Sequence, residues 1–497
     1  MTPSDYFNRR RSGILLHPTS LPGPWGNGDL GEEAYRFADF LNASGQTVWQ
    51  MLPLGPTHFH GSPYQCLSVH AGNHLLISPA ELIKQGWLDT QVFESALVSG
   101  EENHKQLRYK LLEYAYHGFC EKATEEDQAA LEDFITAEEH WLQDYALYQA
   151  LRKENKGNDW SLWPPQLRDR KAAALKKAQS RLHKLIHQIY FEQFIYFRQW
   201  SMLKAYANNR GILMFGDMPI FVDYDSADVW ANRHYFALDE NGKPTIVTGV
   251  PPDYFSATGQ RWGNPHYRWE VMQDDDFQWW KDRIKTQLKY FDFIRVDHFR
   301  GFESYWEIPA SDMDARGGHW VRAPGDELFQ SLYNAFGELP LVAEDLGLIT
   351  PEVKALRERY HLPGMSILQF AFDSDNHNPY LPHNHGYNTV VYTGTHDNDT
   401  TLGWYMQLSD STRRYVDDYL GNMDEEIPWP MIRCAQASVA RMAIVPMQDV
   451  LMLGSEYRMN TPGTMGDNWQ WRFNWEQLPA GAGERLQHYT HLYGRTG

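Results

Sequence analysis

Short apolar segments alternate with longer amphipathic ones along most of the chain. Eight of the apolar segments are five or six residues long, are rich in β-branched or aromatic residues and are bounded by glycine, proline or polar residues, which predicts buried strands. Helical periodicity follows several of them, as in 32–41 and in 351–360, where Thr350 can serve as the N-cap and Pro351 as the first helical residue. The eight predicted strands are 13–17, 47–52, 211–216, 291–296, 339–343, 365–370, 389–393 and 449–453.

Eight buried strands interleaved with helices predict a (β/α)8 barrel rather than an open sheet. About 160 residues separate the second and third strands, too many for one helix and its loops. This stretch, approximately 80–205, contains helix-period runs and predicts a mostly helical subdomain inserted after the second strand. A second, loop-rich insertion of approximately 221–270 follows the third strand. We expect residues 1–497 to form one catalytic domain that carries both insertions.

Composition narrows the class of protein. With 42% hydrophobic and 22% charged residues, the 497-residue chain has enough apolar side chains for a large core. A formal net charge of −19 argues against nucleic acids and anionic membranes as partners. No apolar run approaches the ~20 residues of a membrane-spanning helix, and the N-terminal region has no secretory-type apolar stretch. Three cysteines (Cys66, Cys120 and Cys434) are typical of a reducing compartment, so we expect a cytoplasmic protein.

Aromatic residues make up 14% of the chain, including 19 tryptophans. Flat aromatic faces suit sugar rings and could line a carbohydrate cleft. The ordinary interpretation is a large core built with aromatic side chains, which bury much area each. Composition alone favours this ordinary interpretation.

Carboxylates follow four of the predicted strands. Asp217, Asp297, Glu344 and Asp397 each stand at or just after the carboxyl end of a strand, with His, Arg or Asn close by. A single such acid can cap the following helix. In a parallel barrel, however, all strand carboxyl ends open onto one face, where active sites lie. Four acids at this face favour a catalytic cluster over four separate caps.

Two carboxylates across a sugar acetal can cleave a glycosidic bond, provided that one is ionised and the other holds a proton. Strand alternation places Arg295 on the same face as Asp297, and a neighbouring guanidinium favours the ionised carboxylate, which predicts Asp297 as the nucleophile. Glu344 follows an uncharged strand, where poor solvation favours the protonated form and predicts the general acid and base. Asp397 is then a third carboxylate that binds sugar hydroxyls and stabilises the transition state.

Four short motifs contain these acids: GDMPIFV at 216–222, IRVDHFRG at 294–301, AEDLG at 343–347 and TGTHDNDT at 393–400. In this order they resemble the motifs of the α-amylase superfamily in its 4-α-glucanotransferase (amylomaltase, or disproportionating enzyme) branch. Further segments resemble signatures of that branch: LLHPTSLPGPWG at 15–26, SPYQ at 62–65, GVPPDYFSATGQRWGNP at 249–265, MNTPG at 459–463 and NWQWR at 468–472. The resemblance therefore covers nearly the whole chain.

The resemblance implies a (β/α)8 barrel with insertions and no C-terminal β-domain. It also implies the same roles for Asp297, Glu344 and Asp397 in a retaining double displacement, through a glycosyl-Asp297 intermediate, on α-1,4-glucans and maltooligosaccharides. No cofactor, metal or obligate protein partner is expected. The resemblance implies that substrate is bound by Tyr64, Gln65, Asp217, Trp262, Arg295, His298, His396 and Asn460. Phe59 occupies a position where some relatives carry tyrosine, so the sequence leaves a remote glucan site open.

A transferase must position an acceptor sugar and keep water from the intermediate. The 249–265 loop, with Tyr254, Phe255 and Trp262 along it, is expected to form a lid over the acceptor side of the cleft. Two alternatives stay open at this point: a hydrolase on the same scaffold, and a catalytically silent glucan-binding protein. The presence of all three carboxylates argues against the second.

Two other patterns are weaker. Residues 26–31 spell G-x-G-x-x-G, but three prolines separate them from the preceding strand and no acid follows the next strand to hold a ribose. His58 and His60, and likewise His383 and His385, form H-x-H pairs in polar segments. Metal ligation by these pairs is an alternative, but we expect exposed loop histidines and no metal site.

Overall fold

The computed structural model describes residues 8–497 except 25, 99–103, 253–255, 422–424 and 465. Eight parallel strands form one sheet in the order β10-β11-β12-β1-β2-β3-β6-β9. The Ala343 N–H, at the end of β9, donates to Pro363 O at 2.8 Å, next to β10, and brings the two outer strands together. The predicted (β/α)8 barrel is confirmed. Its strands are β1 (Arg11–Leu15), β2 (Val48–Gln50), β3 (Leu213–Pro219), β6 (Phe293–Asp297), β9 (Leu341–Ala343), β10 (Gly364–Ile367), β11 (Thr389–Tyr392) and β12 (Met442–Pro446).

The eighth predicted strand, 449–453, is wrong. The eighth strand of the barrel is β12, at Met442–Pro446, whereas Met447–Val450 form the short helix α18. Both segments are apolar and buried, and periodicity cannot separate a short buried strand from a buried helical turn. Asp449 of α18 accepts hydrogen bonds from Thr393 Oγ1 at 2.6 Å and from Thr401 N at 2.8 Å, which fixes this turn beneath the end of β11.

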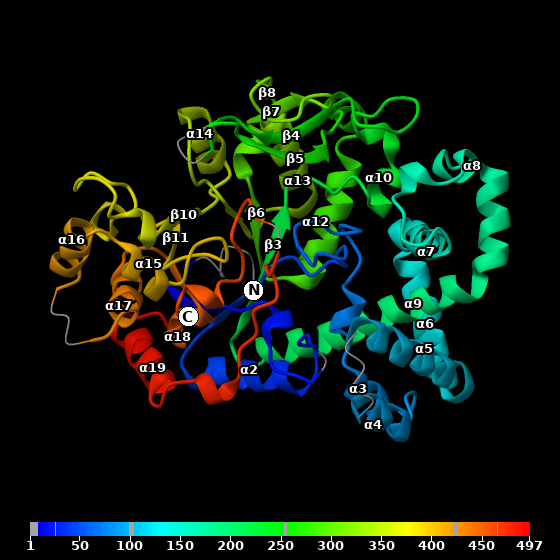
Figure 1. Ribbon diagram of the computed structural model, residues 1–497, viewed down its shortest axis with the longest axis horizontal. Coiled ribbons are helices and arrows are strands. Elements are labelled where there is room, and N and C mark those ends of the chain that lie inside the picture. Colours follow the sequence, from blue (N-terminus) through cyan, green and yellow to red (C-terminus); the bar gives the residue numbers. More distant parts are fainter. Residues whose placement is uncertain (1–7, 25, 99–103, 253–255, 422–424, 465) are drawn as a thin grey trace.

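Helices surround the barrel, and most barrel strands are followed by at least one (Figure 1). After β12 the described residues contain helices and loops, and no further β-sheet. No helix in the described part of the chain is long and apolar enough to cross a membrane. Outside the segment between β2 and β3, the α-helices are α2 (Glu32–Ala43), α10 (Ala227–Ala231), α11 (Trp269–Asp274), α12 (Gln278–Tyr290), α13 (Gly325–Phe336), α14 (Pro351–Arg359), α15 (Thr401–Gln407), α16 (Asp410–Leu420), α17 (Trp429–Ala437), α18 and α19 (Ala482–Leu492).

The segment between β2 and β3 is helical and extends to one side of the barrel (right in Figure 1). Its longest helix, α9, returns the chain to β3. Two buried glutamines of α9 hydrogen-bond the backbone of the preceding loop. Gln193 accepts the Gly72 N–H at 2.8 Å and donates to Gly72 O at 3.0 Å, and Gln199 makes the same pair of bonds with Ser78. The helices are α3 (Pro79–Lys84), α4 (Thr90–Val98), α5 (His104–Lys122), α6 (Glu125–Ala137), α7 (Glu139–Glu154), α8 (Pro165–Arg168) and α9 (Ala172–Asn208).

A small antiparallel sheet, which the sequence analysis does not foresee, stands beyond the carboxyl ends of the barrel strands (top of Figure 1). It joins the 221–270 segment to residues that follow β6, because β4 pairs with both β5 and β7. These strands are short and find partners far along the chain, so local pattern alone indicated loops. Its strands are β4 (Ile246–Val250), β5 (Gln260–Pro265), β7 (Ser304–Pro309) and β8 (His319–Arg322).

Candidate active site

Strand register brings four of the predicted side chains together. In the β3–β6 pair, Asp217 lies opposite Arg295 and Pro219 lies opposite Asp297. In the β6–β9 pair, Val296 lies opposite Ala343, so Asp297 and Glu344 are the next residues on neighbouring strands. The acids that the sequence predicts at separate strand ends therefore meet at one mouth of the barrel.

Arg295 connects two of these acids. Its Nη1 donates to Asp217 Oδ1 at 2.8 Å and Oδ2 at 2.7 Å, and its Nη2 lies 3.0 Å from Asp297 Oδ1. The Arg295 and Asp217 side chains are almost fully buried, whereas that of Asp297 is 30% exposed. Asp217 thus balances the buried guanidinium, and Asp297 remains reachable by a ligand while it contacts the same cation.

Glu344 has a different environment. Burial raises the pKa of Glu344 to about 7, with the Asp297 charge adding to the rise and Arg295 opposing it. The carboxylate accepts the His298 N–H at 2.7 Å on Oε2 and the Leu346 N–H at 3.1 Å on Oε1. His298 has a φ of 53°, in the left-handed region, where the chain turns directly after Asp297. The direction of the pKa shift is the one that the apolar strand before Glu344 predicts.

Asp397 follows β11 and is held by the C-terminal segment. Asn460 Nδ2 donates to Asp397 Oδ1 at 2.6 Å, and His396 Nε2 lies 3.2 Å from Oδ2. Arg458 Nη2 donates to the Asp397 backbone oxygen at 3.0 Å. Burial opposes ionisation, but His396 and Asn460 outweigh it and lower the pKa of Asp397 well below its usual range. The side chain is an ionised carboxylate that is 44% exposed at the mouth.

Tyr64 and His396 form one wall of the mouth. The Tyr64 hydroxyl donates to Asp217 Oδ2 at 2.7 Å, and its ring stacks on His396 with centroids 5.2 Å apart and planes 14° apart. Burial raises the pKa of Tyr64 well above 10, so the phenol keeps the hydrogen that it donates. Gln65 follows in the same turn, where its N–H donates to Ser62 O at 3.3 Å.

Trp469 completes this wall and was missed as a site residue. Its ring lies 5.8 Å from Tyr64 and 6.0 Å from His396. It is one of the non-glycine residues with a left-handed backbone, at a φ of 67°, a strained conformation that often marks a functional position. The sequence carried a signal, since Trp469 lies within the NWQWR motif, but only as a family signature.

Trp262 lies on β5 and packs against His298, the residue after Asp297. Its ring meets His298 edge to face, with centroids 4.9 Å apart, and Phe221 packs beside both at 6.4 and 6.3 Å. Burial lowers the pKa of His298 to about 4, so its imidazole is neutral. Tyr254 and Phe255, predicted for the same lid, lie outside the described residues.

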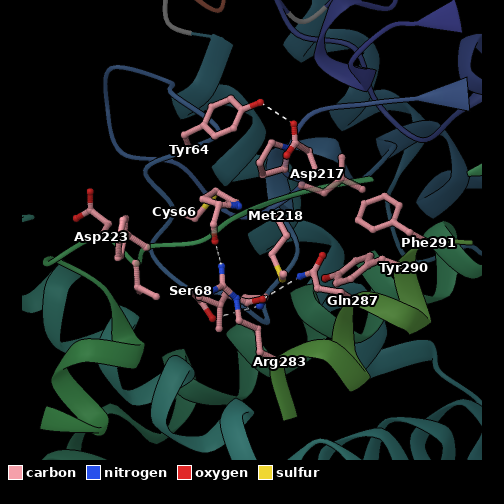
Figure 2. Close-up of a pocket in the computed structure, with 18 residues that line it drawn as sticks. Tyr64, Cys66, Ser68, Asp217, Met218, Asp223, Arg283, Gln287, Tyr290 and Phe291 are labelled. Carbon is pink, nitrogen blue, oxygen red and sulfur yellow. Dashed lines mark hydrogen bonds between the residues drawn. The ribbon is translucent and has the colours of Figure 1, made fainter. Parts of the chain in front are cut away.

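A small cavity of about 40 Å³ lies behind Tyr64 and Asp217 (Figure 2). At its far end is Arg283 of α12, which is 2% exposed and donates to Pro219 O and, at 3.1 Å, to Ile220 O. Arg283 therefore fixes the backbone just after Asp217. No sequence pattern predicts this role, since a lone arginine on an amphipathic helix is normally a solvent-facing residue.

The expectation of exposed H-x-H histidines holds for only one residue of each pair. His60 and His383 are exposed, whereas His385 is buried and bonded to Ser438 Oγ at 2.7 Å, and His58 packs 3.3 Å from Asp223 Oδ1. Among the residues that the structure describes, no group of three or more His, Cys, Asp or Glu side chains is arranged to hold a metal ion.

Comparison with known proteins gives one answer along the whole chain. A family model described as 4-alpha-glucanotransferase matches residues 16–477. The 4-alpha-glucanotransferase of Thermus thermophilus is 50% identical over 490 residues, which are 96% of this chain and 97% of that protein. The one from Synechocystis sp. is 49% identical over 501 residues, 98% of this chain and 99% of its own length.

Solved structures agree. Amylomaltase from Streptococcus agalactiae, in complex with acarbose, matches with a TM-score of 0.94 at 37% identity and covers 98% of this chain and 100% of that one. Amylomaltase from Corynebacterium glutamicum shares the fold with a TM-score of 0.80 at 17% identity, over 99% of this chain and 76% of that one. This chain therefore belongs to the 4-alpha-glucanotransferase family and is an enzyme with that activity.

Proposed function

We propose that the enzyme moves a segment of an α-1,4-glucan to the 4-hydroxyl of another glucan, or of glucose, by a retaining double displacement. Asp297 is the nucleophile, Glu344 the general acid and base, and Asp397 the stabiliser of the transition state. The observation that carries the proposal is the contrast between the two neighbouring acids. Asp297 contacts a buried guanidinium, whereas burial holds a proton on Glu344.

In the first step, Asp297 Oδ attacks the anomeric carbon while Glu344 gives its proton to the departing glycosidic oxygen. The bond from the anomeric carbon to that oxygen breaks, and an ester to Asp297 forms. In the second step, Glu344 takes the proton of the acceptor 4-hydroxyl, whose oxygen displaces Asp297. The products hold the same number of glycosidic bonds as the reactants.

The Glu344 environment supports both steps. A pKa of about 7 leaves this residue close to half protonated at neutral pH, which suits a group that must give and then take a proton. The negative charge of Asp297 helps to raise that pKa. Ester formation removes the charge, so the pKa of Glu344 falls when its base form is needed.

The remaining predicted residues take substrate-binding roles in this proposal. Asp217, Arg295, His298 and His396 surround the reacting glucose, Tyr64 is its platform, Gln65 and Asn460 lie on the donor side, and Trp262 lies on the acceptor side. The S. agalactiae amylomaltase structure contains acarbose, which supports an oligosaccharide ligand for the corresponding site here. Glucans and maltooligosaccharides are therefore the proposed partners of this chain.

Two further proposals concern the segments inserted into the barrel. Residues 80–205 form a helical subdomain on the barrel. Residues 221–270 cover the acceptor side of the cleft, which is supported by the contact of Trp262 with His298. A cytoplasmic location is supported by the three free cysteines, Cys66, Cys120 and Cys434.

Incubation with maltotriose tests transfer against hydrolysis. Transfer predicts glucose plus longer maltooligosaccharides at a constant number of reducing ends. A steady increase in reducing ends would show that water, not a sugar, accepts the glycosyl group.

The nucleophile is tested by Asp297→Ala, with the exposed Asp133→Ala on α6 as the matched control. We expect the first variant to lose transfer and cleavage and the second to keep both. Substantial activity in Asp297→Ala would assign the nucleophile to another carboxylate.

A further inference from the structure

A second hollow lies apart from the catalytic carboxylates, where the helical segment meets the barrel. It has a volume of about 120 Å³ and is lined from α7, α10 and α12 and from the loop after Tyr64. Helices α7 and α10 lie on this flank of the molecule (Figure 1). None of the residues proposed above for catalysis or substrate binding lines it. We name it the side cleft and define it by His70, Trp141, Asp228, Gln278, Trp279 and Asp282.

Two hydrogen-bond acceptors face each other in the side cleft. Thr286 Oγ1 donates to Asp282 O at 3.1 Å, so His70 Nδ1–H is the donor in its 2.8 Å bond to Thr286 Oγ1. Burial lowers the pKa of His70, which leaves Nε2 as a neutral acceptor. Asp228 Oδ1 lies 3.9 Å from that nitrogen, while Oδ2 accepts the Val69 N–H at 2.9 Å. A ligand with two adjacent hydroxyls can donate one hydrogen to each acceptor.

Aromatic rings form the walls of the side cleft. His70 stacks on Trp141 with centroids 5.8 Å apart and planes 16° apart. Trp279 is 5% exposed, and its buried Nε1–H has no hydrogen-bond partner among the described residues. At the rim, Gln278 Nε2 donates to Asp282 Oδ1 at 3.0 Å and leaves the amide oxygen and one carboxylate oxygen for a ligand. Flat apolar walls with both donors and acceptors are typical of saccharide sites.

We propose that the side cleft binds one end of a glucan chain, about one glucose unit deep, as a second saccharide site. The volume corresponds to about four water molecules at the ~30 Å³ that each occupies in the liquid, so the hollow takes the end of one glucose unit and the rest of the glucan lies outside it. Carboxylates of Asp144, Asp228 and Asp282 line it. Asp144 is paired with Arg170 at 2.6 Å, whereas Asp228 and Asp282 have no Lys or Arg ion-pair partner among the described residues, so a neutral polyhydroxy ligand is favoured over a phosphorylated or acidic one. The proposal rests on the glucan substrate class of the family and not on the roles assigned to the three catalytic carboxylates.

The side cleft lies behind the segment that carries Tyr64. Ser68 lines both the side cleft and the cavity beneath Tyr64, at the end of that cavity away from the Tyr64 ring (Figure 2). The side cleft therefore adjoins the cavity beneath Tyr64 through Ser68.

Equilibrium dialysis with labelled maltotriose tests the proposal. All variants carry Asp297→Ala to prevent turnover, and bound equivalents per chain are counted at saturation. Gln278→Ala/Asp282→Ala removes the rim groups, and His70→Phe removes the Nε2 acceptor while keeping a ring against Trp141. Each is expected to bind one equivalent fewer than the Asp297→Ala parent.

The matched control is Gln330→Ala/Asn334→Ala on α13. There too an exposed glutamine donates its Nε2, at 3.0 Å, to the side chain four residues later, but away from the side cleft. This control is expected to bind as many equivalents as the parent. Equal numbers in the parent, the control and both cleft variants would overturn the proposal. Residual activity in Asp297→Ala would overturn the assigned nucleophile and not the side cleft. In that case the same count of bound equivalents is made with labelled acarbose in place of maltotriose, and the cleft variants are again expected to bind one equivalent fewer than the parent.

Discussion

Glu344→Gln gives the sharpest test of the site because it changes stability and activity in separate ways. Burial raises the pKa of Glu344 from 4.5 to about 7 in the folded protein. Between pH 4.5 and pH 7, Glu344 is therefore protonated in the folded state and ionised in the unfolded state. Folding is disfavoured as pH rises through this window, and the loss is complete above about pH 7. Glutamine does not titrate, so the variant lacks this loss.

The size of the effect follows from the shift. A rise from 4.5 to about 7 corresponds to at most about 3.4 kcal/mol, and because Glu344 is only partly buried, solvent screening reduces this to about 1–3 kcal/mol. Glutamine has one oxygen where Glu344 uses two to accept the His298 and Leu346 N–H groups, so the variant also loses part of a hydrogen bond. That second loss is independent of pH.

Urea unfolding of both proteins at pH 5 and at pH 8 measures the difference. We expect the stability of Glu344→Gln relative to the wild type to rise by about 1–3 kcal/mol between the two pH values, with activity lost at both. Glu192→Gln is the matched control, since burial also raises the pKa of Glu192 to about 7, in α9 and away from the mouth. It should show the same pH effect on stability and keep full activity. If the free energies of unfolding of Glu344→Gln and the wild type changed equally between the two pH values, burial would not raise the pKa of Glu344 as assigned.

Three further outcomes are expected. Asn460→Ala removes the 2.6 Å bond that orients Asp397, so kcat for maltotriose transfer should fall about tenfold, and an unchanged kcat would contradict this. Tyr64→Phe removes the hydrogen bond to buried Asp217 and should lower the free energy of unfolding by about 1.5–3 kcal/mol, measured in urea, and a change below the error would contradict it. Dialysis against EDTA should leave maltotriose transfer unchanged, and a loss restored by a divalent cation would reveal a metal requirement.

The central part of the site was predictable because it is built from neighbouring strand ends. Asp217 lies near the carboxyl end of β3, Asp297 ends β6 and Glu344 follows β9, and the regular register of a parallel barrel brings such positions side by side. Strand alternation likewise placed Arg295 beside Asp297. These inferences need only the period of the strand and the position of the acid within it.

The parts that were missed depend on contacts between distant segments. The β4–β7 pairing joins residues about sixty positions apart, and neither strand is long enough to stand out locally. Arg283 is buried only because α12 packs beneath the end of β3, and Trp469 joins the mouth only because the C-terminal segment folds over Tyr64. No periodicity within one segment reports such packing.

In the proposed mechanism Glu344 acts as an acid in one step and as a base in the next, so a pKa raised much further would prevent the second step. Burial and the Asp297 charge raise the pKa, whereas Arg295 and the N–H groups of His298 and Leu346 oppose the rise. The left-handed turn at His298 belongs to this balance, because it lies directly after Asp297 and supplies one of those N–H groups at 2.7 Å. A single backbone turn thereby links the position of Asp297, the proposed nucleophile, to the acidity of Glu344, and any change in that turn should alter both together.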